Sequence, residues 1–321
     1  MAPGDGIARP LRKGPPGSAR TPALPAALLL AAMLLLPCRY VSAQGAPAPA
    51  APVSAQDDAG RTVTLPAPAR RIVSLAPHAT EILYAAGAGA RLVGAIEHSD
   101  YPPAARQLPS VGGAATFDVE RIAALRPDLV VAWSSGNSPG KIARLRSLGI
   151  PVFESEPRDF AAIGSSLERL GRLAGTDAAG RAAALAFEKR RQALAAKYAH
   201  RAPVRVFYQV WRAPLMTLNG SHLVSQALTL CGGENVFAAL PQLAPAVSLE
   251  AVLQADPEAI FAGSGEPGAL DDWRRWPRLA AVARGNLFTV PSDTMTRPGP
   301  RILDGTETLC RQLESARAKR K

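Results

Sequence analysis

One stretch of the chain, residues 71–133, constrains the possible fold more than any other. Short apolar runs rich in β-branched residues (71–75, 92–96 and 129–133) alternate in it with segments that have the apolar spacing of amphipathic helices. This alternation predicts βα units and a parallel sheet. Polar and aromatic residues follow the expected strand ends, where open α/β sheets bind their ligands. The stretch is therefore interpreted as half of a ligand-binding cleft.

The same alternation continues towards residue 174. Thr80 is expected to begin a helix that ends before Gly87. The later elements of this part are expected to be helices at 118–125, 141–148 and 160–174 and a strand at 152–154. Together these elements predict one doubly wound α/β lobe over residues 61–175.

Residues 176–201 interrupt this pattern. They hold strong helix formers with no breaker after Gly180, so they would form one helix roughly 35 Å long. A strand at 204–210 then opens a second α/β unit, which closes with a helix at 302–318. We therefore expect a second lobe over residues 202–321, joined to the first by one long rigid helix.

The first 43 residues have the features of a secretory signal peptide. Four basic residues precede an apolar run at 23–36, and the small-residue pattern Val41-Ser42-Ala43 follows. Cleavage near Ala43 and a periplasmic location are therefore expected. A retained membrane anchor is the alternative, although about 14 apolar residues are too few to span a bilayer. Lipidation of Cys38 is a further alternative, which the proline before it disfavours.

The region after the leader, residues 44–60, is rich in Ala and Pro and is expected to be a disordered linker. Residues 60–68 are expected to form a short edge strand that ends at a proline. Removal of the leader, with its five basic residues and one acidic residue, lowers the net charge from +11 to about +7. The remaining basic residues are dispersed, which disfavours a nucleic-acid partner.

Two cysteines, Cys231 and Cys310, remain after the leader is removed. An even number of cysteines in an exported protein suggests a disulfide, with two unpaired buried thiols as the alternative. The sequence has no H-E-x-x-H motif and no P-loop. A non-catalytic protein is therefore favoured over an exported enzyme.

A short internal echo relates the two expected lobes. Segments 120–132 and 250–262 each begin with a glutamate, place a proline seven residues later and an acid eight residues later, and continue into a strand. Asp118 and Ser248 are expected to cap the two helices. A glutamate in a first helical turn can simply stabilise the helix dipole. The symmetric pair could also dock two basic pockets of a two-fold symmetric partner.

The chain resembles the periplasmic substrate-binding proteins of ABC importers, in particular the members that bind the corrinoid cobalamin (vitamin B12). The resemblance covers residues 70–318. It is carried by the order and spacing of the motifs Ser99-Asp-Tyr-Pro-Pro103, Glu120-Arg-Ile122, Pro127-Asp-Leu-Val130, Ala132-Trp133, Cys231-Gly-Gly-Glu-Asn-Val-Phe237 and Pro300-Arg-Ile302 before Cys310.

The resemblance implies a clamp-like, monomeric protein with a ligand in the cleft between its lobes. Tyr101 and Trp133 would be aromatic platforms for the corrin ring, and Asp293 and Arg297 would be polar contacts from the second lobe. Glu120 and Glu250 would bind arginines of the permease dimer. The family disulfide would join Cys231 to Cys310. Cobalamin would be the transported ligand, with no resident cofactor or metal.

The chain departs from the cobalamin binders at three positions. Ala114, Ala244 and Thr294 stand where tryptophans are expected, and Trp211 and Phe117 would compensate if they face the cleft. Loss of three rings would lower the affinity or admit a related ligand, so a close cobamide, haem and a ferric siderophore stay open.

Two histidines near strand ends are further candidates. His78 and His98 would ligate iron or cobalt or, as is more usual for a lone histidine, form structural hydrogen bonds. His98 is retained among the expected ligand contacts. Trp273 and Trp276 are expected to be packing residues.

Overall fold

The structure, a computed structural model, describes residues 51–320, which lie in one compact unit. The expected signal peptide with Cys38, and the first part of the expected linker, lie outside the described residues. Within residues 51–320, no helix is both long enough and apolar enough to cross a membrane.

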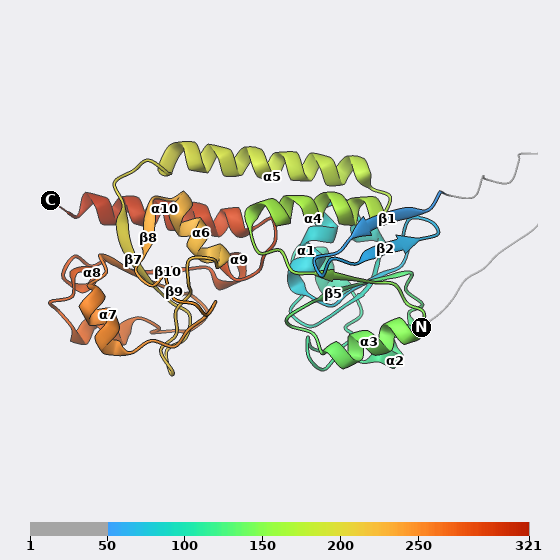
Figure 1. The fold of residues 1–321 in the computed structure, drawn as a ribbon, viewed down its shortest axis with the longest axis horizontal. Coiled ribbons are helices and arrows are strands. Elements are labelled where there is room, and N and C mark those ends of the chain that lie inside the picture. The colour runs from blue at the N-terminus through green and yellow to red at the C-terminus, as the bar shows by residue number, and fades with distance from the viewer. Residues whose placement is uncertain (1–50, 321) are drawn as a thin grey trace, which may run out of the picture. The chain divides into compact units, whose positions relative to one another are not determined.

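Two four-stranded parallel sheets form the centres of two lobes (Figure 1). The N-terminal sheet has the order β4-β3-β5-β6, and its strands are Leu92–Ala95, Ile72–Ser74, Leu129–Trp133 and Val152–Ser155. The C-terminal sheet has the order β10-β9-β7-β8, and its strands are Leu287–Val290, Ala259–Gly263, Val204–Gln209 and Gly233–Asn235. Counted along the chain within each lobe, both sheets have the order second, first, third, fourth. The predicted two-lobed α/β fold is confirmed.

Helices cover the two sheets and join the lobes. In the N-terminal lobe these are α1 to α4, at Pro77–Ala85, Val119–Ala124, Pro139–Ser147 and Phe160–Leu173. In the C-terminal lobe they are α6 to α10, at Leu223–Leu230, Leu249–Ala255, Ala280–Ala283, Ser292–Met295 and Ile302–Ala318. Short 3-10 turns lie at Gly89–Arg91, Pro103–Gln107 and Asp271–Arg275.

The joining helix α5, Asp177–Tyr198, runs along one edge of the molecule beside α4 and α10 (Figure 1). Two glycines bring its backbone close to α4. A Cβ atom at Gly180 would lie 2.7 Å from the carbonyl oxygen of Leu167, and one at Gly171 would lie 3.0 Å from the Gly180 Cα. Towards α10, Arg190 forms ion pairs with Asp304 at 2.5 Å and with Glu307 at 3.0 Å.

The internal echo occupies equivalent places in the two lobes. Each copy is the helix before the third strand, α2 before β5 and α7 before β9. Asp118 and Ser248 cap these helices, as predicted, by accepting hydrogen bonds from the amides of Arg121 and Ala251.

The acid after each proline ties its strand to the first strand of the lobe. Asp128 accepts hydrogen bonds from the amides of Arg70 and Arg71 at 2.8 and 2.9 Å. Glu258 accepts one from the amide of Arg205 at 3.2 Å. The echo therefore has a structural role in both lobes: it positions neighbouring strands.

The prediction of a disordered linker at residues 44–60 is wrong for the last part of that range. Residues Val53–Gln56 form strand β1, which pairs antiparallel with β2, Thr62–Leu65. Asp57 closes the turn by accepting the amides of Ala59 and Arg61. Asp58 anchors the hairpin to the lobe through an ion pair with Arg169 at 2.6 Å. These tertiary contacts order a stretch whose composition alone indicated disorder.

Cys231 and Cys310 form a disulfide with a Cα–Cα distance of 4.8 Å. Cys231 ends α6 and Cys310 lies in α10, and both are fully buried. The bridge therefore clamps α6 to the last helix of the C-terminal lobe.

Candidate ligand-binding cleft

A cavity of about 670 Å³ opens between the two lobes, and we call it the interlobe cleft. The N-terminal lobe contributes the residues that follow β5 and β6 at their carboxyl ends. The C-terminal lobe contributes the start of α6, the loop before α7 and the end of α9. The lining residues are Trp133, Ser135, Glu156, Pro157, Arg158, Asp159, Asn219, Ser221, His222, Leu223, Gln226, Pro241, Leu243, Met295, Thr296 and Pro298.

Trp133 is the aromatic side chain of this cleft, and its surroundings fix its orientation. Its amide donates to the Asn137 Oδ1 at 2.7 Å, which holds the turn after β5. A Cβ atom at position 136 would lie 1.9 Å from the indole ring, so only glycine fits beside it. The ring of His78 contacts the indole edge-on, with the centroids 5.9 Å apart. The indole is therefore pre-oriented at the cleft wall.

His78 supports Trp133 from below and does not line the cleft. It is buried, and its Nε2 lies 3.2 Å from the Ser155 Oγ. Burial lowers the pKa of His78 to about 4, so the ring is neutral at neutral pH. The structure therefore favours a structural hydrogen bond for His78 over ligation of iron or cobalt.

The C-terminal wall is built around the first turn of α6. His222 caps this helix, because its Nδ1 accepts a hydrogen bond from the Val224 amide at 3.1 Å. Gln226, one turn later, donates across the cleft to the carbonyl oxygen of Arg158 at 3.1 Å. This neutral hydrogen bond joins the lobes at the edge of the cleft.

A cluster of charges joins the lobes beside the cleft, and we call it the interlobe ion-pair cluster. It consists of Glu81, Asp100, Asp293, Arg297 and Arg301. Glu81 of α1, with only 2% of its side chain exposed, lies 2.7 Å from Arg301 and 3.3 Å from Arg297.

The two arginines also bind one outer acid each. Arg297 reaches Asp100 at 2.6 Å and Arg301 reaches Asp293 at 2.9 Å. A hydrogen bond from Arg297 lowers the pKa of Asp100, and hydrogen bonds to Glu81 raise the pKa of Arg301. Asp100 and Arg301 therefore stay charged at neutral pH. Asp293 and Arg297 were expected from the sequence to be ligand contacts, and it was not predicted that the five residues form one cluster.

Several expected ligand contacts lie in or beside this cluster and not on the cleft wall. Arg297 and Asp293 are both engaged in it, and neither lines the cleft. Tyr101 is 44% exposed and has the Arg301 guanidinium 4.0 Å from its ring centroid. It lines a neighbouring hollow with Pro300.

The prediction that Phe117 contacts the ligand in the cleft is wrong. It is fully buried and packs in the N-terminal core, with the Lys141 ammonium 5.2 Å from its ring centroid. It precedes α2, and the loop turns its side chain under the sheet because an apolar ring gains most from burial there. It therefore cannot compensate for a missing cleft aromatic.

Trp211 and His98 also lie away from the cleft lining. Trp211 is 58% exposed and donates its Nε1–H to the carbonyl oxygen of Ala213 at 2.9 Å, so its polar end is satisfied within its own loop. His98 is exposed, has φ of 63°, and lines a separate hollow with Ser99 and Arg106.

The three positions without tryptophan differ from one another. Ala114 is half-buried, and its carbonyl oxygen accepts from the Asn137 Nδ2 at 2.8 Å beside the cleft turn. Ala244 is exposed. Thr294 is buried and donates to the carbonyl oxygen of Pro291 at 3.0 Å.

Glu120 and Glu250 lie in the first turns of α2 and α7 and are exposed. Both helices lie on the edge of the molecule opposite α5, one in each lobe (Figure 1). Neither carboxylate forms an ion pair with another described residue. Both are therefore accessible to a partner.

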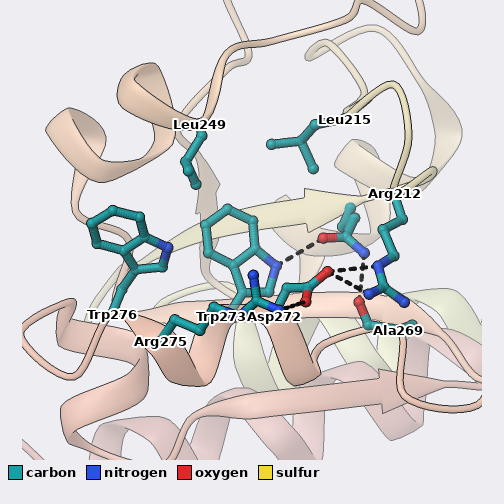
Figure 2. A pocket seen from close by; sticks show the side chains of 9 residues that line it. Arg212, Leu215, Leu249, Ala269, Asp272, Trp273, Arg275 and Trp276 are labelled. Carbon is teal, nitrogen blue, oxygen red and sulfur yellow. Dashed lines mark hydrogen bonds and ion pairs between the residues drawn. The ribbon is translucent and has the colours of Figure 1, made fainter.

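A second hollow, of about 280 Å³, lies within the C-terminal lobe (Figure 2). Trp273 forms its floor and donates its Nε1–H to the Gln209 Oε1 at 2.8 Å, and Gln209 donates in turn to Ala269. Arg212 and Asp272 close the rim with an ion pair at 2.6 Å. Trp273 is buried, in agreement with its predicted packing role, whereas Trp276 is 39% exposed.

One spacing in the cleft region matches a catalytic motif. Residues 136–140 have the pattern G-x-S-x-G and link β5 to α3, as a nucleophile elbow would. A serine nucleophile needs a base within hydrogen-bond reach. Among residues 51–320, no histidine hydrogen-bonds Ser138, and His78 and His222 bind Ser155 and Val224 instead.

Two parallel α/β lobes, a single long helix between them and an aromatic cleft at their strand ends define a two-lobed ligand-binding protein. The comparisons agree. The model of the family described as "Periplasmic binding protein" matches residues 72–294. The chain belongs to the periplasmic binding protein family.

Several relatives have names that include a ligand. The chain is 41% identical over 252 residues to the vitamin B12-binding protein of Vibrio cholerae serotype O1, covering 78% of this chain and 91% of the relative. The crystal structure of periplasmic vitamin B12 binding protein BtuF of Vibrio cholerae matches with a TM-score of 0.71 at 40% identity, covering 78% and 98%. A periplasmic heme binding protein from Pseudomonas aeruginosa matches with a TM-score of 0.65 at 26% identity, covering 75% and 91%.

His222 and Gln226 were missed by the sequence analysis. The available signal was the position of His222 directly before the apolar pattern of residues 223–230, where capping residues stand. Histidine is not among the preferred capping residues, so the signal was weak.

Proposed function

We propose that this protein is the periplasmic component of an ABC importer and that it binds cobalamin or a close corrinoid in the interlobe cleft. The observation that carries the proposal is the 41% identity to a vitamin B12-binding protein over 91% of that protein's length. The cleft is consistent with it, because Trp133, Leu223 and Leu243 offer apolar surface and the many polar side chains of the lining offer hydrogen bonds to an amphipathic disc. The proposal includes export of the protein and cleavage of its leader near Ala43.

Trp133 is the platform for the ring system in this proposal. Its indole is held in place from two sides before any ligand arrives, by His78 and by the turn at Gly136. A pre-oriented aromatic side chain loses little conformational freedom on binding, so most of its contact energy appears as affinity. Tyr101, Asp293 and Arg297 would act from beside the cleft, chiefly by fixing the distance between the lobes.

Delivery is proposed to use Glu120 and Glu250. The two carboxylates lie in equivalent helices of two lobes with the same strand order, and both are exposed. A permease dimer with one basic pocket per subunit would match this repeated arrangement. A monomeric binding protein suffices for such docking, because its own two lobes supply the symmetry.

Haem is the second candidate ligand. The observation that favours it is the likeness to the Pseudomonas aeruginosa heme binding protein, at 26% identity. The missing tryptophans at Ala114, Ala244 and Thr294 also leave room for a ligand other than cobalamin.

A titration tests the ligand. The purified mature protein is titrated with cyanocobalamin and, separately, with haemin, and absorbance and tryptophan fluorescence are followed. We expect saturable binding of cyanocobalamin at micromolar concentration or below. Absence of a response to cyanocobalamin, or tighter binding of haemin, would contradict the corrinoid proposal.

Two matched substitutions locate the site. Trp133→Ala should weaken cyanocobalamin binding by at least about tenfold, because a buried aromatic contact dominates such interfaces. Trp276→Ala removes a half-exposed tryptophan outside the cleft and should leave the affinity unchanged. Equal effects of the two changes would argue against the interlobe cleft.

Charge reversal tests docking. Glu120→Lys combined with Glu250→Lys should leave ligand binding intact and abolish uptake by cells that rely on this importer. Loss of ligand binding in the double variant would refute the docking role.

A further inference from the structure

His222 faces the interlobe cleft in a fixed tautomeric form. Its Nδ1 accepts the hydrogen bond of the Val224 amide at 3.1 Å, so this nitrogen has no proton of its own. A neutral imidazole has one protonated nitrogen, which here must be Nε2. The structure therefore presents an N–H donor at this wall of the cleft.

The ring is held neutral as well. Burial lowers the pKa of His222, because the charged form loses hydration. The amide of Val224 opposes protonation for a second reason, since a proton on Nδ1 would meet another N–H. His222 is consequently a neutral donor.

No residue of the described part of the chain accepts a hydrogen bond from the His222 Nε2. The His222 Nε2 atom is also not among the polar side-chain atoms that are fully buried without a hydrogen-bond partner. It is thus open to the cleft, where a bound molecule can supply the acceptor.

The same tautomer excludes His222 as a metal ligand, because a protonated nitrogen has no free lone pair. The other side chains near the cleft that could ligate a metal already form contacts within the protein. Met295 packs its sulfur on α10, where a Cβ at Gly305 would lie 2.5 Å from it. Glu156 and Asp159 accept backbone amides at 2.9 and 2.7 Å.

The charges on the cleft wall favour an uncharged acceptor. Glu156 and Asp159 lie on the same wall as Arg158, which leaves an excess of one negative charge. A carboxylate of the ligand would be repelled by this excess, whereas an amide carbonyl would not.

We propose that His222 donates its Nε2–H to a neutral carbonyl group of the bound ligand, such as a side-chain amide of a corrinoid, and does not coordinate the ligand's metal. This inference rests on the proposed corrinoid function and deepens it. It makes His222 a specificity-determining residue that favours amide-bearing over carboxylate-bearing tetrapyrroles.

The decisive variant is His222→Asn. Asparagine is a good helix cap, so its Oδ1 can accept the hydrogen bond of the Val224 amide and keep α6 intact, while its shorter side chain places no donor at the position of the imidazole Nε2. We expect cyanocobalamin affinity to fall about two- to tenfold, the range of one neutral hydrogen bond. The exposed His200 supplies the matched control, since His200→Asn should leave the affinity unchanged. Unchanged affinity in His222→Asn would overturn the inference.

Two spectroscopic measurements separate this role from a merely structural one. Nitrogen NMR of the ligand-free protein should show His222 neutral and protonated on Nε2, and the opposite tautomer would overturn the inference. Aquocobalamin should keep its absorption spectrum on binding, whereas a shift to an imidazole-ligated spectrum that His222→Asn abolishes would also overturn it. If the wild-type protein binds no cyanocobalamin, the corrinoid function fails while the NMR result still decides the tautomer.

Discussion

The lobes meet in two places that differ in chemistry. At the edge of the interlobe cleft, a neutral hydrogen bond from Gln226 to the carbonyl oxygen of Arg158 joins the lobes. In the interlobe ion-pair cluster, Glu81 is buried between Arg297 and Arg301. The charged contact fixes the lobes, and the neutral one leaves room for a ligand. The residues that hold the lobes together by charge are therefore not the residues that line the cavity.

The largest expected effect comes from removing the central carboxylate of the cluster. Glu81→Ala leaves two arginines, each with less than a fifth of the side chain exposed, without their buried partner. Breaking a buried ion pair in this way costs about 3–5 kcal/mol. Urea unfolding of the variant and the parent measures the difference.

The control for that change is an exposed ion pair between other elements. Glu307→Ala removes a half-exposed partner of Arg190, so it should cost no more than about 1 kcal/mol. Equal losses from the two substitutions would show that the cluster is no more than a surface contact.

A smaller effect is expected in the cleft. Gly136→Ala would place a Cβ 1.9 Å from the Trp133 indole and displace the ring. Such overpacking costs about 1–3 kcal/mol, and we expect cyanocobalamin affinity to fall roughly tenfold. Titration checks the affinity and thermal unfolding checks the stability.

Gly140 provides the matched glycine. A Cβ there meets nothing within 4 Å, so Gly140→Ala should change neither quantity appreciably. If Gly136→Ala also binds normally, the fixed indole is not needed for recognition.

The smallest effect is a pH dependence of the cluster. Arg297 lowers the pKa of Asp100, so the pair stabilises the fold above the ordinary carboxyl pKa of about 4. This stabilisation is lost as the pH falls from there through the lowered pKa of the folded state. Because Asp100 is 46% exposed, it amounts to less than about 1 kcal/mol.

Asp100→Asn removes the titrating group. The difference in unfolding free energy between parent and variant should therefore shrink between pH 5 and acid conditions. A difference that stays constant over that range would mean that Asp100 is not stabilised by Arg297.

Local signals made most of the fold predictable. The α2 and α7 helices, their caps Asp118 and Ser248, and the breaker-free helix α5 all follow from neighbouring residues. Strand β1 was not predictable, because its order comes from the contact of Asp58 with Arg169, 111 positions away.

The site was less predictable for the same reason. Trp133 was found because it ends a strand, and strand ends meet at one edge of the sheet. Arg297 pairs with Glu81, 216 positions earlier, and no local pattern shows such a pairing. Phe117 stood in a loop, and a sequence does not show to which side a loop side chain turns.

The two ends of α5 attach to the molecule by different means. On α4 its backbone is held by close contact at Gly171 and Gly180, which salt does not weaken. On α10 it is held by the half-exposed pairs of Arg190, which salt screens. A rise in ionic strength should therefore loosen the Arg190 contacts with α10 and leave the glycine contact with α4 unchanged.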